Sequence, residues 1–160
     1  MIIAPPASTP VAIPPVVVTP SMLHRAVPTP TQALYRGMVK LTPEEAVMKA
    51  ADAAPRPVVG VFEFEVRRAE QVGPNFFIGS EGDYRDPRNL SARIFPQALP
   101  ELRARFGPDL SKAFIGRKIR VVGGAMRVRI DFIGGGQRTG KYYYQTQLPV
   151  GDANQIETAN

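Results

Sequence analysis

The run from Lys118 to Ile133, KIRVVGGAMRVRIDFI, constrains the fold of this chain more than any other segment. From its middle onward, apolar and polar residues alternate without a break. Met126, Val128, Ile130 and Phe132 fall on one side, and Arg127, Arg129 and Asp131 fall on the other. A period of two over this length predicts a β-strand with one buried face and one solvated face.

A glycine pair interrupts this alternation. The apolar residues Ile119 and Val121 stand on odd numbers before Gly123-Gly124, whereas the later ones stand on even numbers. A slip of one residue at glycine is typical of a β-bulge, where a strand bends. The sequence therefore predicts a long, bent strand of the kind that a small closed β-barrel needs.

Four further segments have the composition and spacing of strands. They are Val58–Arg68, Asn75–Gly79, Asn89–Phe95 and Lys141–Val150. In the first of them Phe62, Phe64 and Val66 are expected to point inward; in the third, Leu90, Ala92 and Ile94 are. Residues 70–74 are predicted to form a turn and residues 134–141, GGGQRTGK, a flexible hairpin loop.

Two helical segments complete the pattern. Thr42 is expected to cap a short helix, because Pro43 suits the first helical position and Glu45 completes a capping box. Residues 96–114 are predicted to be helical with a break at Gly107-Pro108, after which Asp109 caps a second short piece.

The predicted order is three strands, a helix and two strands. This order favours a mainly β fold: a five-stranded Greek-key, OB-fold-like barrel with a helix between strands three and four. The predicted divisions are a proline-rich tail or linker at residues 1–40, a short helix packing on the barrel at 41–56, and the barrel at 57–160.

The proline-rich start contrasts with the rest of the chain. Residues 1–33 hold eight of the 17 prolines, and Arg25 is the one formally charged residue there. Prolines at this density exclude a helix and favour a disordered, extended segment. The functional alternative is a ligand for an aromatic-lined groove, or a tether to a protein partner through residues 1–40.

Composition narrows the function. The chain has no cysteine, which excludes a thiolate metal site, and a single histidine, His24, which disfavours a histidine metal site and a Ser-His-Asp triad; no cofactor is predicted. A net charge of +6 and a pI of about 10 favour anionic partners such as nucleic acid. No apolar run has the length of a membrane span, and the start lacks the basic region of a signal peptide, which favours the bacterial cytoplasm.

Three phrases resemble a group of small bacterial OB-fold proteins of mostly unknown function. They are GSEGDYRD at residues 79–86, where the group's pattern has Asn in place of Gly79, GRKIRVVG at residues 116–123, and Gln155-Ile156. The resemblance covers residues 57–158. It implies an OB-fold barrel and no defined reaction.

Basic and aromatic residues are predicted to share the solvent-facing side of the barrel. Guanidinium groups suit phosphates and flat rings suit base stacking, which together are what single-stranded nucleic acid needs. The candidate ligand-binding residues are Phe77, Tyr84, Arg85, Arg88, Arg93, Arg127, Arg129, Arg138, Lys141 and Tyr143. The competing interpretation is a solvated strand face on which the tyrosines pack across strands.

The loop SEGDYRDPR at residues 80–88 carries a second hypothesis. Glu81, Asp83 and Asp86 have the oxygen chemistry that divalent cations prefer, and with Arg85 and Arg88 they resemble the residue types of a staphylococcal-nuclease-like phosphodiesterase. Alternating charges more simply predict local ion pairs and turns. Tyr84 and Arg85 contacting a ligand is the remaining alternative.

The sequence thus predicts a non-catalytic binding module for single-stranded nucleic acid or another anionic ligand, and not an enzyme. The alternatives are a protein-interaction or envelope-associated module tethered by its proline-rich start, and a metal-dependent nuclease.

Overall fold

The structure, a computed structural model, describes residues 37–159. The predicted proline-rich tail lies outside these residues up to position 36, as does the protein contact expected of it. Within the described part, no helix has the length and apolar character needed to cross a membrane.

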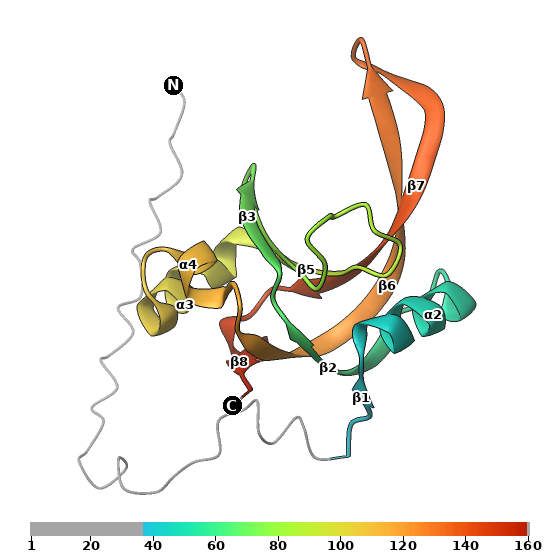
Figure 1. Cartoon of the computed structure of the whole chain (residues 1–160). Coiled ribbons are helices and arrows are strands. Elements are labelled where there is room, and N and C mark those ends of the chain that lie inside the picture. The colour runs from blue at the N-terminus through green and yellow to red at the C-terminus, as the bar shows by residue number, and fades with distance from the viewer. Residues whose placement is uncertain (1–36, 160) are drawn as a thin grey trace, which may run out of the picture.

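The described chain is mainly β, and its strands form one curled sheet (Figure 1). The strands are β1 (Lys40–Leu41), β2 (Val58–Glu65), β3 (Arg68–Val72), β4 (Asn75–Gly79), β5 (Leu90–Ile94), β6 (Lys118–Gly134), β7 (Gln137–Val150) and β8 (Ile156–Thr158). The α-helices are α2 (Pro43–Ala53), α3 (Leu99–Phe106) and α4 (Leu110–Phe114), and the 3-10 turns are η2 (Pro96–Ala98) and η3 (Ala153–Gln155).

The sheet curls into a barrel because β2 and β3 are almost one strand with two different neighbours. The sheet runs in the order β1-β2-β6-β7-β5-β4-β3, so β2 and β3 lie near its opposite ends. The exchange of neighbours takes place between two consecutive residues. Val66 N donates to Arg117 O beside β6 at 2.8 Å, and Arg67 N donates to Gly79 O of β4 at 3.0 Å.

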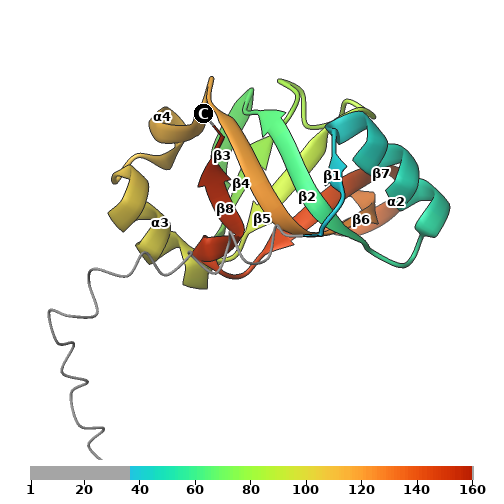
Figure 2. The ribbon, with the colours of Figure 1, turned by 90° about the horizontal axis from the view of Figure 1, so that it is seen from below.

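Helices cover the two ends of this curled sheet, with α2 at one end and α3 and α4 at the other (Figure 2). The helix α2 begins as predicted: the Thr42 hydroxyl accepts from Glu45 N, and the Glu45 carboxylate accepts from Thr42 N. Its buried residues are Ala46 and Ala50, whose small side chains let it lie close to the strands. The predicted break at Gly107 separates α3 from α4, and Asp109 caps α4 through Lys112 N.

The predicted inward residues form the core. Phe62, Phe64 and Val66, and likewise Leu90, Ala92 and Ile94, are all buried. The number of strands differs from the prediction, because the sheet formed by residues 37–159 has eight strands and not five. One extra strand arises where the first predicted strand divides into β2 and β3, so that most of residues 70–74, predicted as a turn, is strand. The others are β1 and β8, which pair with β2 and β6.

The predicted bulge at Gly123-Gly124 is wrong. The register between β2 and β6 continues without a shift from Val58↔Ala125 to Glu65↔Lys118. Both glycines instead permit close packing: a Cβ on Gly123 would lie 3.0 Å from Leu148 Cδ1, and one on Gly124 would lie 3.0 Å from Pro57 Cβ. The irregularity in β6 lies farther along, between Asp131 and Ile133.

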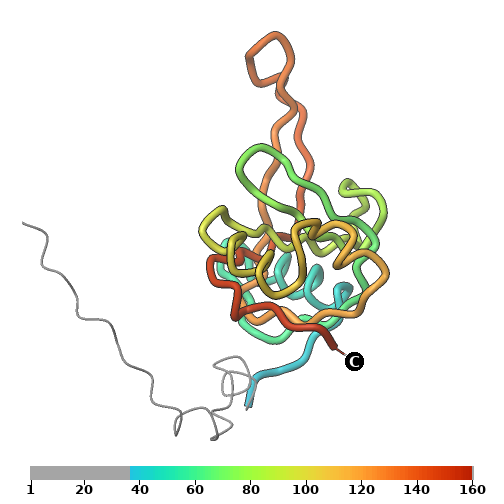
Figure 3. Tube along the Cα trace, turned by 90° about the vertical axis from the view of Figure 1, so that its left-hand side faces the viewer, coloured from blue at the N-terminus to red at the C-terminus, as the bar shows by residue number. Residues whose placement is uncertain are grey.

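The change of apolar phase has a different cause: β6 leaves the barrel after Ala125, its last pairing with β2. On its other side β7 pairs with β5, and this pairing begins only at Thr146. Residues 128–145 therefore form a two-stranded ribbon that projects beyond the barrel (Figures 1 and 3). Together with Met126 and Arg127 at its base, this ribbon is the arm, residues 126–145. Phe132, expected to be buried, is 39% exposed there.

The hairpin predicted at residues 134–141 is present, but its loop is shorter than predicted. The strands continue to Gly134 and from Gln137, so the turn consists of Gly135 and Gly136. Both residues have positive φ angles, 59° and 78°, which glycine adopts without the steric cost that a Cβ brings.

An ion-pair cluster joins β2 to β6 and makes stability depend on acid. The Glu63 carboxylate lies 2.7 Å from Arg120 Nε and 2.9 Å from Lys118 Nζ, and these cations lower the pKa of Glu63 from 4.5 to about 2. A carboxyl group whose pKa is lower in the folded state than in the unfolded state stabilises the fold at pH values above its unfolded pKa. This contribution is lost as the pH falls toward 2.

Glu63→Gln should therefore lower the free energy of unfolding at pH 7 by about 1 kcal/mol, since these partly exposed charges are screened by solvent. Thermal unfolding followed by circular dichroism should show a melting temperature about 3 °C lower for the variant than for the wild-type protein at pH 7. This gap between the two melting temperatures should close as the pH falls toward 2. The control is Glu65→Gln, which removes an exposed carboxylate of the same strand with no ion pair among the described residues. A gap that persists unchanged at pH 2 would contradict the assignment.

Candidate functional site

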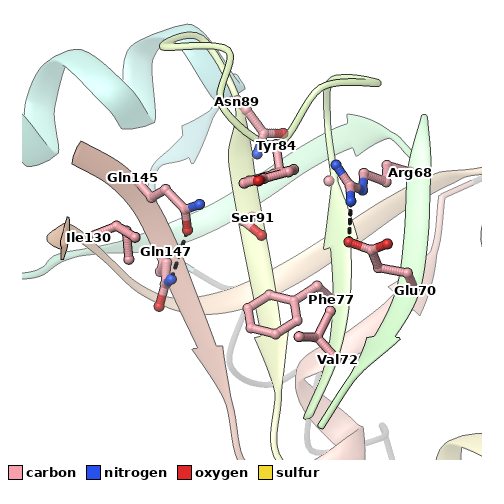
Figure 4. A pocket seen from close by; sticks show the side chains of 11 residues that line it. Arg68, Glu70, Val72, Phe77, Tyr84, Asn89, Ser91, Ile130, Gln145 and Gln147 are labelled. Carbon is pink, nitrogen blue, oxygen red and sulfur yellow. Dashed lines mark hydrogen bonds and ion pairs between the residues drawn. The ribbon is translucent and has the colours of Figure 1, made fainter. Parts of the chain in front are cut away.

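A cavity of about 460 Å³ lies on the outer face of the barrel sheet, where β3, β4, β5, β7 and the base of the arm adjoin (Figure 4). It is lined by Arg68, Glu70, Val72, Phe77, Gly79, Tyr84, Asn89, Ser91, Ile130, Gln145 and Gln147. A second cavity, of about 500 Å³, lies beside α3 and α4 and contains none of the predicted ligand-binding residues.

Strand register brings the cavity residues together. Phe77 stands opposite Glu70 of β3 and Arg93 of β5, and Ser91 stands opposite Gln147 of β7. Because side chains alternate across a strand, the residues next to these point into the core. Ile78, Ala92 and Leu148 accordingly have no exposed surface.

The loop between β4 and β5 places Tyr84 over the cavity. The base of the loop is fixed by two side-chain contacts: Ser80 Oγ accepts from Leu90 N at 2.9 Å, and Asn89 Oδ1 accepts from Glu81 N at 3.0 Å. The guanidinium of Arg68 lies 4.6 Å from the centre of the Tyr84 ring, within the range of a cation–π contact. These contacts place the Tyr84 ring at the edge of the cavity.

A chain of polar side chains runs along β7 beside the cavity. Gln147 Nε2 donates to Gln145 Oε1 at 2.9 Å, and Gln145 Nε2 donates to the Tyr143 hydroxyl at 3.0 Å (Figure 4 shows the first of these bonds). Burial raises the pKa of the Tyr143 hydroxyl above its usual value. The chain leaves the Gln147 Oε1 acceptor and the Tyr143 O–H donor available to a ligand.

Two arginines near the cavity lack an acidic side chain to pair with among the described residues. Arg85 donates its Nε to the Tyr84 hydroxyl at 2.9 Å. Arg93 lies over the Phe95 ring at 5.2 Å, and its buried Nε has no hydrogen-bond partner in the described part of the chain. Buried donors are nearly always satisfied by protein groups or by ordered water, so this Nε requires an acceptor that the described residues do not supply. Arg68, in contrast, is paired with Glu70.

The structure divides the predicted ligand-binding residues into separate groups. Phe77 and Tyr84 line the cavity, Arg93 stands opposite Phe77, and Arg85 and Tyr143 lie beside these.

The remaining predicted residues lie elsewhere. Arg127 and Arg129 alternate with the cavity residue Ile130 and so occupy the opposite face of the arm. Arg138 and Lys141 lie farther out on the arm. Arg88 is bound to Asp86, 2.8 Å away, and the hydrogen bond from Arg88 lowers the pKa of Asp86 to about 2.

The three carboxylates of the acidic loop each accept from a neighbouring arginine. Glu81 pairs with Arg67 at 3.1 Å, Asp83 Oδ1 accepts from Arg85 N at 2.9 Å, and Asp86 pairs with Arg88. Across residues 37–159 there is no group of three or more His, Cys, Asp or Glu side chains placed to hold a metal ion. The arrangement is that of local ion pairs and turns.

Several cavity residues were not among the sequence candidates. They are Arg68, Glu70, Asn89, Ser91, Gln145 and Gln147. The alternation along a strand predicts which face of that strand each residue occupies. It does not predict that these residues meet around one cavity, because that depends on the parallel pairing of β5 with β7, which are far apart in the sequence.

Comparisons with known proteins identify no family for this chain. No family model and no curated protein matches it. Similar solved structures include a putative aspartyl-tRNA synthetase from Leishmania major Friedlin, with 13% identity and a TM-score of 0.44 over 78% of this chain and 21% of that chain. The p204 HINb domain has 11% identity and a TM-score of 0.41 over 76% of this chain and 47% of that chain.

A third similar structure is a murine DNA binding protein bound with double-stranded DNA, with 14% identity and a TM-score of 0.34 over 67% of this chain and 42% of that chain. This chain thus spans less than half of each of these structures.

Proposed function

We propose that this chain is a non-catalytic binding module with an OB-type barrel, and that it holds single-stranded nucleic acid across the outer face of the sheet. The barrel type is supported by the strand order. Counting β2 with β3 as the first strand, it pairs with β4 and β6, and β5 pairs in parallel with β7. A helical segment lies between β5 and β6, as an OB-fold requires.

The cavity and the residues beside it carry the functional proposal, because together they offer the three kinds of group that a nucleotide uses. Phe77 and Tyr84 supply flat faces for a base to stack on. Gln147 and Tyr143 supply an acceptor and a donor for base edges. The guanidiniums of Arg85 and Arg93 supply positive charge for phosphates.

The test is fluorescence anisotropy of a labelled oligo(dT) of about 12 nucleotides, within the ~4–16 that one OB-type site covers. Binding should weaken as salt increases, since phosphate contacts release counterions. Phe77→Ala should raise the Kd at least fivefold, because stacking on an aromatic ring contributes about 1–3 kcal/mol per base.

Matched variants separate stacking from simple bulk. Phe77→Tyr should keep most of the affinity, whereas Phe77→Leu, which keeps an apolar side chain without a ring, should lose it. Arg103→Ala, at an exposed arginine of α3, should change the Kd less than twofold. Anisotropy that does not rise at low salt, or equal affinities for the leucine and tyrosine variants, would refute the proposal.

A further inference from the structure

The face of the arm that points away from the cavity carries its own set of rings and guanidiniums. The arm back face consists of Arg127, Arg129, Asp131, Tyr142 and Tyr144, which the register places side by side: Arg127↔Thr146, Arg129↔Tyr144 and Asp131↔Tyr142. The other face of the arm bears the cavity residues Ile130 and Gln145. Since side chains alternate along each strand, these two sets are on opposite sides of one ribbon.

The arm back face is an ordered stack. The guanidinium of Arg127 lies 3.6 Å from the centre of the Tyr144 ring, and that of Arg129 lies 4.1 Å from the centre of the Tyr142 ring. The two rings meet edge to face, with centres 5.7 Å apart. Stacking uses the flat faces of the guanidiniums and leaves their N–H edges available for hydrogen bonds.

The rings and one cation of this stack are open to a partner. Tyr142 and Tyr144 are 48% and 44% exposed. Arg129 donates to Asp131 at 3.0 Å, whereas Arg127 has no acidic partner within residues 37–159. The fork of Arg127 is therefore free to bind an oxyanion in two-point fashion.

Charge decides the kind of partner. Among residues 126–145 the cations are Arg127, Arg129, Arg138 and Lys141, and the sole anion is Asp131. A second copy of the arm would carry the same excess of positive charge and would be repelled. A chain with regularly spaced negative charges and flat groups fits both the arginines and the exposed tyrosine rings.

We infer that the arm back face is a second binding surface for single-stranded nucleic acid, separate from the cavity, so that one protein molecule bridges two strands. This inference rests on the proposed function for the class of ligand. It does not rest on the cavity, because the two surfaces share no residue. Phosphates would bind the edge of Arg127, and bases would stack on Tyr142 and Tyr144.

The experiment uses oligo(dT) of about eight nucleotides, within the ~4–16 that one such surface covers. Stoichiometry is measured by calorimetry, and bridging is measured by energy transfer between donor-labelled and acceptor-labelled strands. The wild-type protein should bind two strands and give energy transfer. The double variant Tyr142→Leu with Tyr144→Leu should bind one strand per protein molecule and give no energy transfer. Arg127→Gln alone should weaken only the binding of the second strand.

The cavity variant Phe77→Ala distinguishes the two proposals. Failure of the arm inference alone would leave one strand per protein, bound at least fivefold more weakly by Phe77→Ala and with unchanged affinity by the arm variants. Failure of the cavity proposal alone would leave one strand that is lost in the arm variants and kept in Phe77→Ala.

Competition identifies the ligand class. Polyglutamate that displaced the strand from the arm as well as oligo(dT) does would overturn the inference, because it would show attraction to any polyanion. Circular dichroism of each variant checks that the arm variants keep the fold. If the tyrosine double variant unfolds, Arg127→Gln, which alters one exposed side chain, tests the arm inference without it.

Discussion

Phe62→Ala should lower the free energy of unfolding by about 4 kcal/mol, the largest effect that we expect from a single substitution in this chain. Phe62 lies in the middle of β2 with no exposed surface, inside the cluster that joins the strands to α2. Removing the ring takes away its transfer free energy and leaves a void that close-packed neighbours fill only in part.

The matched control for this prediction is Phe132→Ala. That ring is on the arm, and its aromatic contact is with Tyr143 at 5.3 Å. An exposed aromatic pair contributes about 1 kcal/mol. Urea unfolding followed by circular dichroism measures both changes, since the chain has no tryptophan to report by fluorescence. Equal losses in the two variants would mean that the arm is packed as firmly as the barrel, contrary to this structure.

Gly60→Val should lower the free energy of unfolding by about 2 to 3 kcal/mol, although valine favours strands and glycine does not. A Cβ at Gly60 would lie 2.9 Å from the Val39 carbonyl oxygen and 3.2 Å from Leu41 Cδ1. The first contact is with backbone, which cannot rotate away. The segment carrying β1 must therefore shift, and the hydrogen bond from Val61 N to Val39 O must break.

Gly82→Val is the control, because a Cβ there meets nothing within 4 Å. It should change the stability by less than about 0.5 kcal/mol. Hydrogen exchange adds a local measurement. In the Gly60 variant the Val61 amide should lose more protection than the lower global stability explains, whereas the amides of β5 should lose only as much as the global stability falls. Gly60→Val that is as stable as the wild-type protein would show that β1 does not lie against β2.

Elements specified by local chemistry could be predicted from the sequence. The capping box of Thr42 and Glu45 set the start of α2, and Gly107 with Asp109 set the break between α3 and α4. The strand β4 was predicted with its observed bounds. In each of these the deciding contacts join residues a few positions apart.

Features that depend on distant segments could not be predicted in this way. The alternation from Met126 onward shows two chemically different faces, but it does not show that the strand has left the barrel there and that neither face is fully buried. Tyr142 and Tyr144 gave no signal as members of a stack, because their arginine neighbours come from the other strand of the arm. Gln145 and Gln147 are ordinary polar strand residues until the β5–β7 pairing places them beside Ser91.

The exchange of neighbours at Val66 and Arg67 has a consequence for how the chain reaches this fold. Residues 58–65 pair with residues 118–125, and residues 90–94 pair with residues 146–150, so the barrel closes only when the last strands have arrived. Such pairings between distant segments give a high contact order, which slows folding. During synthesis, β2 to β5 emerge first, and the edges of β2 and β5 have unpaired hydrogen-bonding groups until β6 and β7 are made. Closure of the barrel is therefore expected to be the slow step of folding, and a chain that ends before residue 146 is expected to stay open and prone to aggregate.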